Sequence, residues 1–184
     1  MPMLDITAEY GSVSRFNHWL GAIIVITMLS IGLYMHELPR GDDRTLWYGI
    51  HISIGVLTFV LIAFRVFWRI ISRTPEAAPQ PAIWRRAASL MHLLLLVGIT
   101  IMFISGPLLV WTGGRPLSPF GLFSLPSPFS GMGDLHDLHE WLEEAHAITA
   151  RVLLVLISIH IVAVLKHLLF SPAILRGRMW GRRF

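Results

Sequence analysis

Two histidines in one long apolar stretch are the residues whose spacing most clearly suggests chemistry. His146 and His160 lie between Glu140 and Phe170, fourteen positions apart. In an α-helix this spacing corresponds to about 21 Å and close to four whole turns, so both imidazoles leave the same helix face. An ionisable residue inside a membrane is costly and is by default a functional hypothesis. The pair therefore predicts two buried ligand sites, one near each side of a bilayer.

The composition indicates that these histidines lie in a membrane protein. The chain has 184 residues, of which 54% are apolar and 14% charged, which is too apolar for an ordinary soluble domain. Each apolar block is long enough to cross a hydrocarbon core of about 30 Å; the blocks span residues 16–36, 46–71, 87–111 and 141–169. We therefore expect an all-α membrane protein, a four-transmembrane-helix bundle over 15–170, with a polar arm at 1–14 and a basic tail at 171–184.

The positive charge follows the helix ends, so its partner is membrane lipid rather than nucleic acid. The formal net charge is +4. The second connector and the C-terminal end are rich in basic residues, namely Arg65, Arg69, Arg73, Arg85, Arg86, Lys166, Arg176, Arg178, Arg182 and Arg183. The connection between the third and fourth blocks has one basic residue, Arg115, and several acidic ones. Because basic residues remain on the inner side of a membrane, both termini are predicted to be cytoplasmic.

Two further features limit the possible classes. The chain has no cysteine, which excludes disulfides, thioether-attached haem and cysteine-ligated iron–sulfur clusters. The first apolar block has no basic region before it and no small-residue cleavage pattern after it, so we expect a retained helix rather than a signal peptide.

The connection over 115–139 contains four prolines among apolar residues, and is predicted to form a short lid over the outer end of the bundle.

The predicted topology sorts four histidines into two pairs at matching depth. His18 and His160 lie on the cytoplasmic side, and His51 and His146 lie on the outer side. Each pair comes from two helices, as clamping a planar cofactor requires. Two imidazoles without carboxylate or thiolate suit a closed zinc site poorly, whereas axial ligation of haem iron by two histidines suits them well. These four residues are therefore predicted to be iron ligands of two haems.

Neighbouring residues extend this interpretation. Gly21 and Gly55 follow His18 and His51 by about one turn, and would leave room for a macrocycle edge. Arg65 lies fourteen residues after His51, on the same face at the inner depth, where it would pair with a haem propionate. The alternatives are that each histidine is a hydrogen-bonded core residue, that Arg65 snorkels to the surface, and that the glycines serve helix contacts alone.

The other histidines give weaker signals. His92 and His167 lie on the inner side, where either would line a quinone site or form a structural hydrogen bond. His139 and His167 lie seven residues from His146 and His160 and on nearly the same face, which makes them the alternative ligands. His36 and His136 lie at or outside the outer boundary, where solvated polar residues are ordinary.

These residues resemble those of the bacterial cytochrome b561 family, the di-haem four-helix membrane cytochromes. The resemblance covers about residues 10–170 and depends on several short segments in a fixed order. They are Tyr10-Gly11, Phe16-Asn17-His18-Trp19-Leu20, His51-Ile52-Ser53-Ile54-Gly55, Arg65-Val66-Phe67-Trp68-Arg69, Ser89-Leu90-Met91-His92-Leu93, Ser105-Gly106, the His146 and His160 pair, and Leu165-Lys166-His167.

The resemblance implies two haem b groups with ligands at His18, His51, His146 and His160. It also implies electron transfer in the bacterial inner membrane between a small periplasmic donor or protein partner and ubiquinone. One branch of the family oxidises superoxide and reduces ubiquinone, which would make the protein an oxidoreductase. Here the segment before His146 carries three glutamates, which would repel an approaching anion and so argue against superoxide.

Two other functions remain open at this point. The chain would serve as the membrane-anchor cytochrome b subunit of a larger oxidoreductase, of the hydrogenase or formate dehydrogenase type, with its acidic outer connection docking the partner. Alternatively, it would be a haem-free membrane adaptor with structural histidines. Haem absorption bands separate the adaptor from the two cytochromes.

Overall fold

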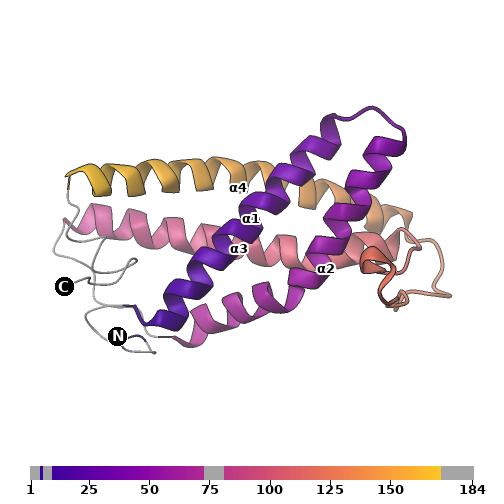
Figure 1. Ribbon diagram of the computed structural model, residues 1–184, viewed down its shortest axis with the longest axis horizontal. Helices are drawn as coiled ribbons and strands as arrows, with labels where there is room; N and C mark the ends of the chain where they lie inside the picture. Colours follow the sequence, from indigo (N-terminus) through magenta and orange to yellow (C-terminus); the bar gives the residue numbers. More distant parts are fainter. Residues whose placement is uncertain (1–4, 6–9, 73–80, 171–184) are drawn as a thin grey trace.

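The computed structural model of the protein describes residues 5, 10–72 and 81–170 (Figure 1). Most of the predicted polar arm, part of the connector between the second and third helices (73–80) and the predicted basic tail (171–184) lie outside the described residues. The predicted orientation of the termini in the membrane therefore stays a prediction.

Four long helices dominate the described residues, as the apolar blocks predict. They are α1 (Ser12–Glu37), α2 (Asp42–Ile71), α3 (Ala82–Thr112) and α4 (His136–Phe170). All four are long and apolar enough to cross a membrane. The helices extend beyond the apolar blocks because the neighbouring polar residues are also helical. Helix α4, for example, begins five residues before the block at 141–169. No strand is present in the described ranges, only an isolated bridge between Leu117 and Leu125.

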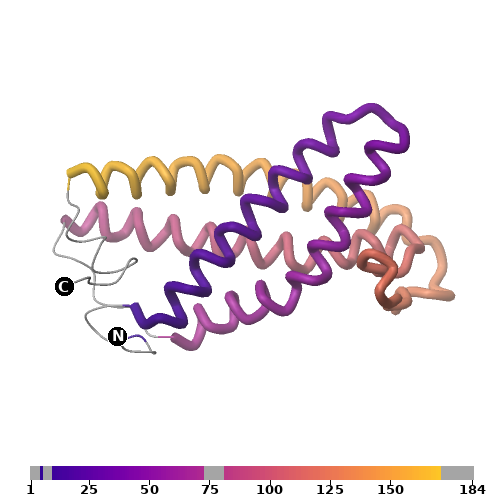
Figure 2. Tube along the Cα trace, in the orientation of Figure 1, coloured from indigo at the N-terminus to yellow at the C-terminus, as the bar shows by residue number. Residues whose placement is uncertain are grey.

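The helices alternate in direction, so the two ends of the bundle carry different segments. In Figure 1, α3 and α4 run side by side along the long axis, while α1 lies obliquely to them. The start of α1, the end of α2, the start of α3 and the end of α4 all lie at one end of the molecule, as the tube in Figure 2 also shows. The turn between α1 and α2 and the start of α4 lie at the other end. We call these the inner end and the outer end.

A seven-residue repeat governs the packing of α3 against α4. A Cβ atom on Gly98 would lie 2.7 Å from Leu153 Cδ2, so the glycine admits the leucine of the facing helix. One heptad along, Ser105 lies against His146, and one heptad further Thr112 lies against His139. Small or hydroxyl-bearing residues at 98, 105 and 112 thus face larger ones at 153, 146 and 139. Such small residues allow close approach of helices in a membrane, where lipid removes the hydrophobic driving force.

The centre of the bundle is a small apolar layer with one buried residue from each helix. It consists of Leu29, Ile62, Ile99 and Leu153. Leu153 is only 1% exposed, and in the α4 sequence it lies midway between His146 and His160. Most other large apolar side chains of the helices face outward, as expected for contact with lipid. The central layer therefore separates an outer histidine from an inner histidine on α4.

The connection between α3 and α4 folds back over the outer end of α2, as predicted for a lid. It contains a short 3₁₀ helix, η1 (Pro119–Gly121). The Phe120 backbone N–H donates a 3.0 Å hydrogen bond to Ser53 Oγ on α2. Phe120 adopts a φ of 49°, which is unusual for a residue with a side chain. We call residues 117–125 the lid.

Candidate functional site

The outer histidine pair lines the larger of the cavities described. His51 on α2 and His146 on α4 both border it, and they lie close enough for their charges to interact. Counting the part that opens outward, the cavity contains about 1050 Å³ of space that no protein atom fills. Its lining is almost entirely apolar and comes from all four helices. An apolar cavity bordered by two imidazoles from different helices is suited to a large, flat, apolar ligand.

His146 is oriented by a hydrogen bond from the neighbouring helix. Ser105 Oγ lies 2.7 Å from His146 Nδ1, and Ser105 is only 4% exposed. Gly106 gives further space, because a Cβ there would lie 3.8 Å from His146 Cε1. A hydrogen bond at one ring nitrogen fixes the orientation of the imidazole and leaves the other nitrogen for a ligand bond.

His51 sits against α1 with an unsatisfied nitrogen. Gly32 of α1 leaves space for it, since a Cβ there would lie 3.3 Å from His51 Cε1. His51 Nδ1 is buried and has no hydrogen-bond partner among the described residues. Buried polar groups normally have a partner. His51 thus lacks, among the described residues, the kind of protein partner that Ser105 gives to His146.

The mouth of the outer cavity contains a cation–π contact. Arg115 Cζ lies 5.4 Å from the ring centroid of Tyr48, which lines the cavity. Leu117, the first residue of the lid, is 3% exposed and also lines the cavity. The lid and α2 thus cover part of the outer site.

The inner pair is accompanied by a third histidine. His18 on α1 lies close enough to His160 on α4 and to His92 on α3 for their charges to interact. The rings of His92 and His160 meet edge to face with centroids 5.7 Å apart. No group of three or more histidines or carboxylates within the described ranges has the geometry to hold a single metal ion.

Arg65 holds the turn of α1 that carries His18. Its Nη1 donates to the backbone carbonyl of Asn17 at 2.9 Å and to that of His18 at 3.2 Å. A Cβ on Gly21 would lie 2.6 Å from Arg65 Cδ. Gly21 therefore provides space for the arginine, and this corrects the expectation that it leaves space for a cofactor edge. Gly55, by contrast, does line the outer cavity.

A chain of hydrogen bonds closes the inner end of α1 against α2. Trp68 Nε1–H donates to Ser14 Oγ at 2.7 Å, and the Ser14 hydroxyl donates to Asp5 Oδ2 at 2.7 Å. Asp5 Oδ1 also accepts from the Gly11 backbone N–H. These contacts and those of Arg65 fix α1 in register with α2.

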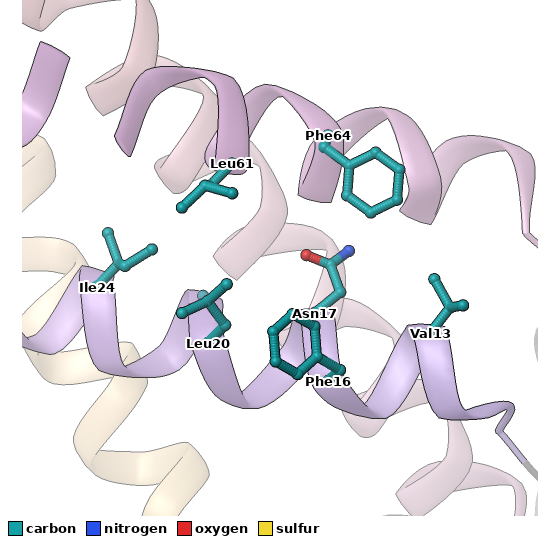
Figure 3. Close-up of a pocket in the computed structure, with 8 residues that line it drawn as sticks. Val13, Phe16, Asn17, Leu20, Ile24, Leu61 and Phe64 are labelled. Atoms are coloured by element: carbon teal, nitrogen blue, oxygen red, sulfur yellow. The ribbon is translucent and has the colours of Figure 1, made fainter. Parts of the chain in front are cut away.

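A smaller groove lies between α1 and α2 away from the histidines. Figure 3 shows Asn17 in it, with its side chain directed toward α2, beside Phe16 and Phe64. Counted in the same way as the outer cavity, with its open part included, the groove contains about 360 Å³. It includes Gly21 but neither His18 nor His160, so it is separate from the inner pair.

The structure thus brings together both predicted histidine pairs, and it places Arg65 at the inner one. Of the alternative ligands, His139 is held by Thr112 Oγ1 at 2.9 Å from its Nδ1, and His167 is exposed. His36 is also exposed, and His136 forms an exposed ion pair with Glu140 at 3.2 Å.

Two features of the site were missed in the sequence. They are the hydroxyl support of His146 by Ser105 and the contact of His92 with His160. The spacing of Gly98, Ser105 and Thr112, matched to that of His139, His146 and Leu153, was the available signal for the first.

Comparison with known proteins gives consistent results over nearly the whole chain. Residues 9–182 match the family described as prokaryotic cytochrome b561. The chain is similar to cytochrome b561 homolog 2 of Escherichia coli (strain K12), with 34% identity covering 99% of this chain and 96% of the relative. It is also similar to cytochrome b561 homolog 1 of the same organism, with 26% identity covering 86% of this chain and 89% of the relative.

Proposed function

The chain belongs to the prokaryotic cytochrome b561 family, and from this premise we propose that it conducts electrons across the membrane through two b haems. At the level of the family, it is a multi-pass bacterial membrane cytochrome that binds haem b and transfers electrons. The proposal adds the number of haems, their ligands and the direction of flow. The outer haem is held by His51 and His146, and the inner haem by His18 and His160.

The observation that carries the proposal is the outer cavity with its two histidines. A b haem of the electron-transfer type would be held by two histidine imidazoles that reach one cavity from different helices. His51 and His146 supply imidazoles from different helices to one apolar cavity that opens outward, and His51 has a buried nitrogen without a partner among the described residues. The residues present therefore fit the group. Bound haem supplies one-electron redox chemistry, and two axial histidines leave no open iron position for oxygen.

The protein's own side chains orient and insulate the two sites. Ser105 fixes the ring of His146, and Arg65 fixes the turn that presents His18. Between the sites lie the central apolar layer and a stacked pair, Phe59 and Phe103, with centroids 4.0 Å apart. These apolar side chains also line the outer cavity, and they offer no polar group that would carry ions from one site to the other.

The proposed partners are a small periplasmic donor or a protein partner at the outer end, and the ubiquinone pool of the inner membrane. Ubiquinone is membrane-soluble and takes up two electrons and two protons. The glutamates of the first turns of α4 argue against superoxide as the donor because they are exposed at the outer end. A neutral or cationic donor suits that surface better.

The same acidic surface favours one second candidate, an anchor subunit of a larger oxidoreductase. Glu140, Glu143 and Glu144 are all exposed and would dock a basic face of a hydrogenase- or formate-dehydrogenase-type partner. The isolated chain would then bind haem but show no turnover with small donors.

Vesicles test the proposal directly. The purified protein is inserted into vesicles containing ferricyanide, a membrane-impermeant one-electron acceptor, and a membrane-impermeant reductant is added outside. Bleaching of ferricyanide that depends on haem-loaded protein is the expected result. Haem-free protein from the same preparation is the control. Intact haem spectra without bleaching would contradict electron conduction through the isolated chain. A second assay measures whether the purified protein alone reduces a short-chain ubiquinone with superoxide. Reduction would indicate that superoxide is the donor, whereas no reduction with intact haem spectra would favour the anchor-subunit function.

A further inference from the structure

Arg65 is a cation within a membrane-spanning helix that no carboxylate neutralises among the described residues. The polar contacts described for Arg65 are the two carbonyl oxygens of Asn17 and His18. Carbonyl dipoles stabilise the guanidinium but leave its net charge in place. A full positive charge therefore remains beside the inner histidine pair, close enough to interact with His18 and His160.

Gly21 fixes where that charge lies. The Arg65 side chain crosses over it, so that Cδ, Nη1 and Nε lie 2.6, 2.8 and 3.0 Å from the position that a Cβ would occupy. Any larger residue at position 21 would displace the arginine. The glycine and the two carbonyl bonds together hold the guanidinium on α1, rather than at the inner surface to which a free side chain would snorkel.

The outer pair has the opposite electrostatic setting. Nearly all described acidic residues lie in the outer half: Glu37, Asp42, Asp43, Asp134, Asp137, Glu140, Glu143 and Glu144. Asp5, at the inner end, accepts hydrogen bonds from Gly11 and Ser14. The described arginines of the outer half are fewer than its acidic residues and lie at or near the surface, where water screens their charge more effectively than that of Arg65; they are Arg40, Arg44 and Arg115. The electrostatic potential is therefore more positive at the inner histidine pair than at the outer one.

We propose that Arg65, placed by Gly21, makes the inner site the more easily reduced of the two and so gives the conduit its inward direction. This inference rests on the proposed function. One electron leaves the outer site and one electron arrives at the inner site, and no bond forms or breaks. A nearby positive charge stabilises the site that gains the negative charge. A Coulomb interaction over about 10 Å, in an effective dielectric of about 20, changes such an equilibrium roughly tenfold. Arg65 is thus a positioning residue for His18 and a source of charge for the inner site.

The first test is a redox titration of Arg65→Gln. Glutamine keeps a donor near the two carbonyls but removes the charge. The equilibrium constant for electron transfer from the outer to the inner site should fall about tenfold, which for one electron equals about 59 mV, while the other haem keeps its potential. The titration repeated with His51→Ala, which leaves only the inner haem, assigns the shifted wave. Arg65→Lys keeps the charge and should recover most of the shift.

Gly21→Ala provides the second, independent variant. It retains the charge but forces the guanidinium away from α1, so the potential of the same haem should fall by a smaller amount. The low-spin electron paramagnetic resonance signal of that haem should also change, because the turn carrying His18 loses its support. Gly49→Ala is the matched control, since a Cβ there meets nothing within 4 Å.

The outcomes separate this inference from the proposed function. Wild-type protein without two haems would refute the function. Two haems with potentials unmoved by both Arg65→Gln and Gly21→Ala would leave the function standing and overturn the role of Arg65. An equal shift of both haems would also overturn it, because the charge would then act on the whole bundle rather than on the inner site.

Discussion

The outer and inner histidine pairs share one helix but are built by different means. The outer pair borders an open, apolar cavity and is braced by a hydroxyl from α3. In the inner pair, the His160 ring contacts a third histidine, His92, and the His18 backbone carbonyl accepts a hydrogen bond from Arg65. Helix α4 supplies one histidine to each pair, fourteen residues apart, while α1 and α2 supply the opposing histidines. Since the partners differ, each site can be tuned without altering the other, which a directional electron conduit requires.

The contrast also suggests a division of labour. The outer site has the open cavity and the lid, so it is suited to meeting an electron donor. The inner site has the buried charge, so it is suited to holding the electron that arrives. The framework between them is common to both, which allows variants to be sorted by whether they affect both sites, one site or only access.

The broadest effect, which reaches both sites, is expected from the shared framework. Gly98→Ala places a methyl group against Leu153, which is 1% exposed and cannot move away freely. Overpacking of this kind typically costs about 1–3 kcal/mol, against a gain of about 1 kcal/mol from the helix propensity of alanine. Thermal unfolding in detergent should show a lower midpoint, with both haems lost together. As the control, Gly49→Ala should leave the midpoint unchanged or raise it. Loss of one haem alone in Gly98→Ala would show that the two sites do not both depend on the packing of α3 against α4.

An effect on the outer site alone is expected from Ser105→Ala. The His146 ring loses the partner of its Nδ1, and loss of such a supporting group typically weakens binding about 10–100-fold. Titration of haem into the apoprotein should show weaker binding at one site and unchanged binding at the other. Ser158→Ala is the control, because that hydroxyl bonds only to the backbone of its own helix at Leu154. Equal weakening at both sites would contradict the assignment of Ser105 to the outer pair.

The smallest effect is expected at the lid. Ser53→Ala removes the acceptor for the Phe120 N–H, a contact worth about 0.5–1.5 kcal/mol. Hydrogen exchange of the amides at 117–125 should accelerate, with both haems retained. Ser30→Ala, which removes an exposed hydroxyl bonded within α1, serves as the control. Unchanged exchange in Ser53→Ala would mean that other contacts hold the lid.

The membrane helices followed from the sequence because lipid imposes a simple rule on them. Apolar blocks of sufficient length become spanning helices, and all four did. All four helices begin four or five residues before the corresponding apolar block, at 12, 42, 82 and 136 rather than 16, 46, 87 and 141. Polar residues can continue a helix outside the hydrocarbon layer, so the apolar pattern alone does not give the helix ends. The lid was predicted from its prolines and apolar residues, whereas its attachment to Ser53 depends on a backbone donor that the sequence does not specify.

The histidine pairs followed from depth alone, which needs only helix rise and topology. Depth alone does not predict which side chains fill the space beside the histidines. Gly21 accommodates Arg65 rather than a cofactor edge because α1 and α2 pack closely at the inner end. His92 turns toward His160 because α3 and α4 share a register that fixes every contact between them. Such choices depend on the rotation of one helix against another, and single-helix periodicity does not determine it.

The most direct test of the account is the haem-to-protein ratio of the wild type and of single alanine variants at seven histidines. Wild type should bind two haems, and each of His18→Ala, His51→Ala, His146→Ala and His160→Ala should bind one. His92→Ala, His139→Ala and His167→Ala should retain two. Retention of both haems in any of the first four, or loss of one in any of the last three, would contradict the assignment of two sites along α4.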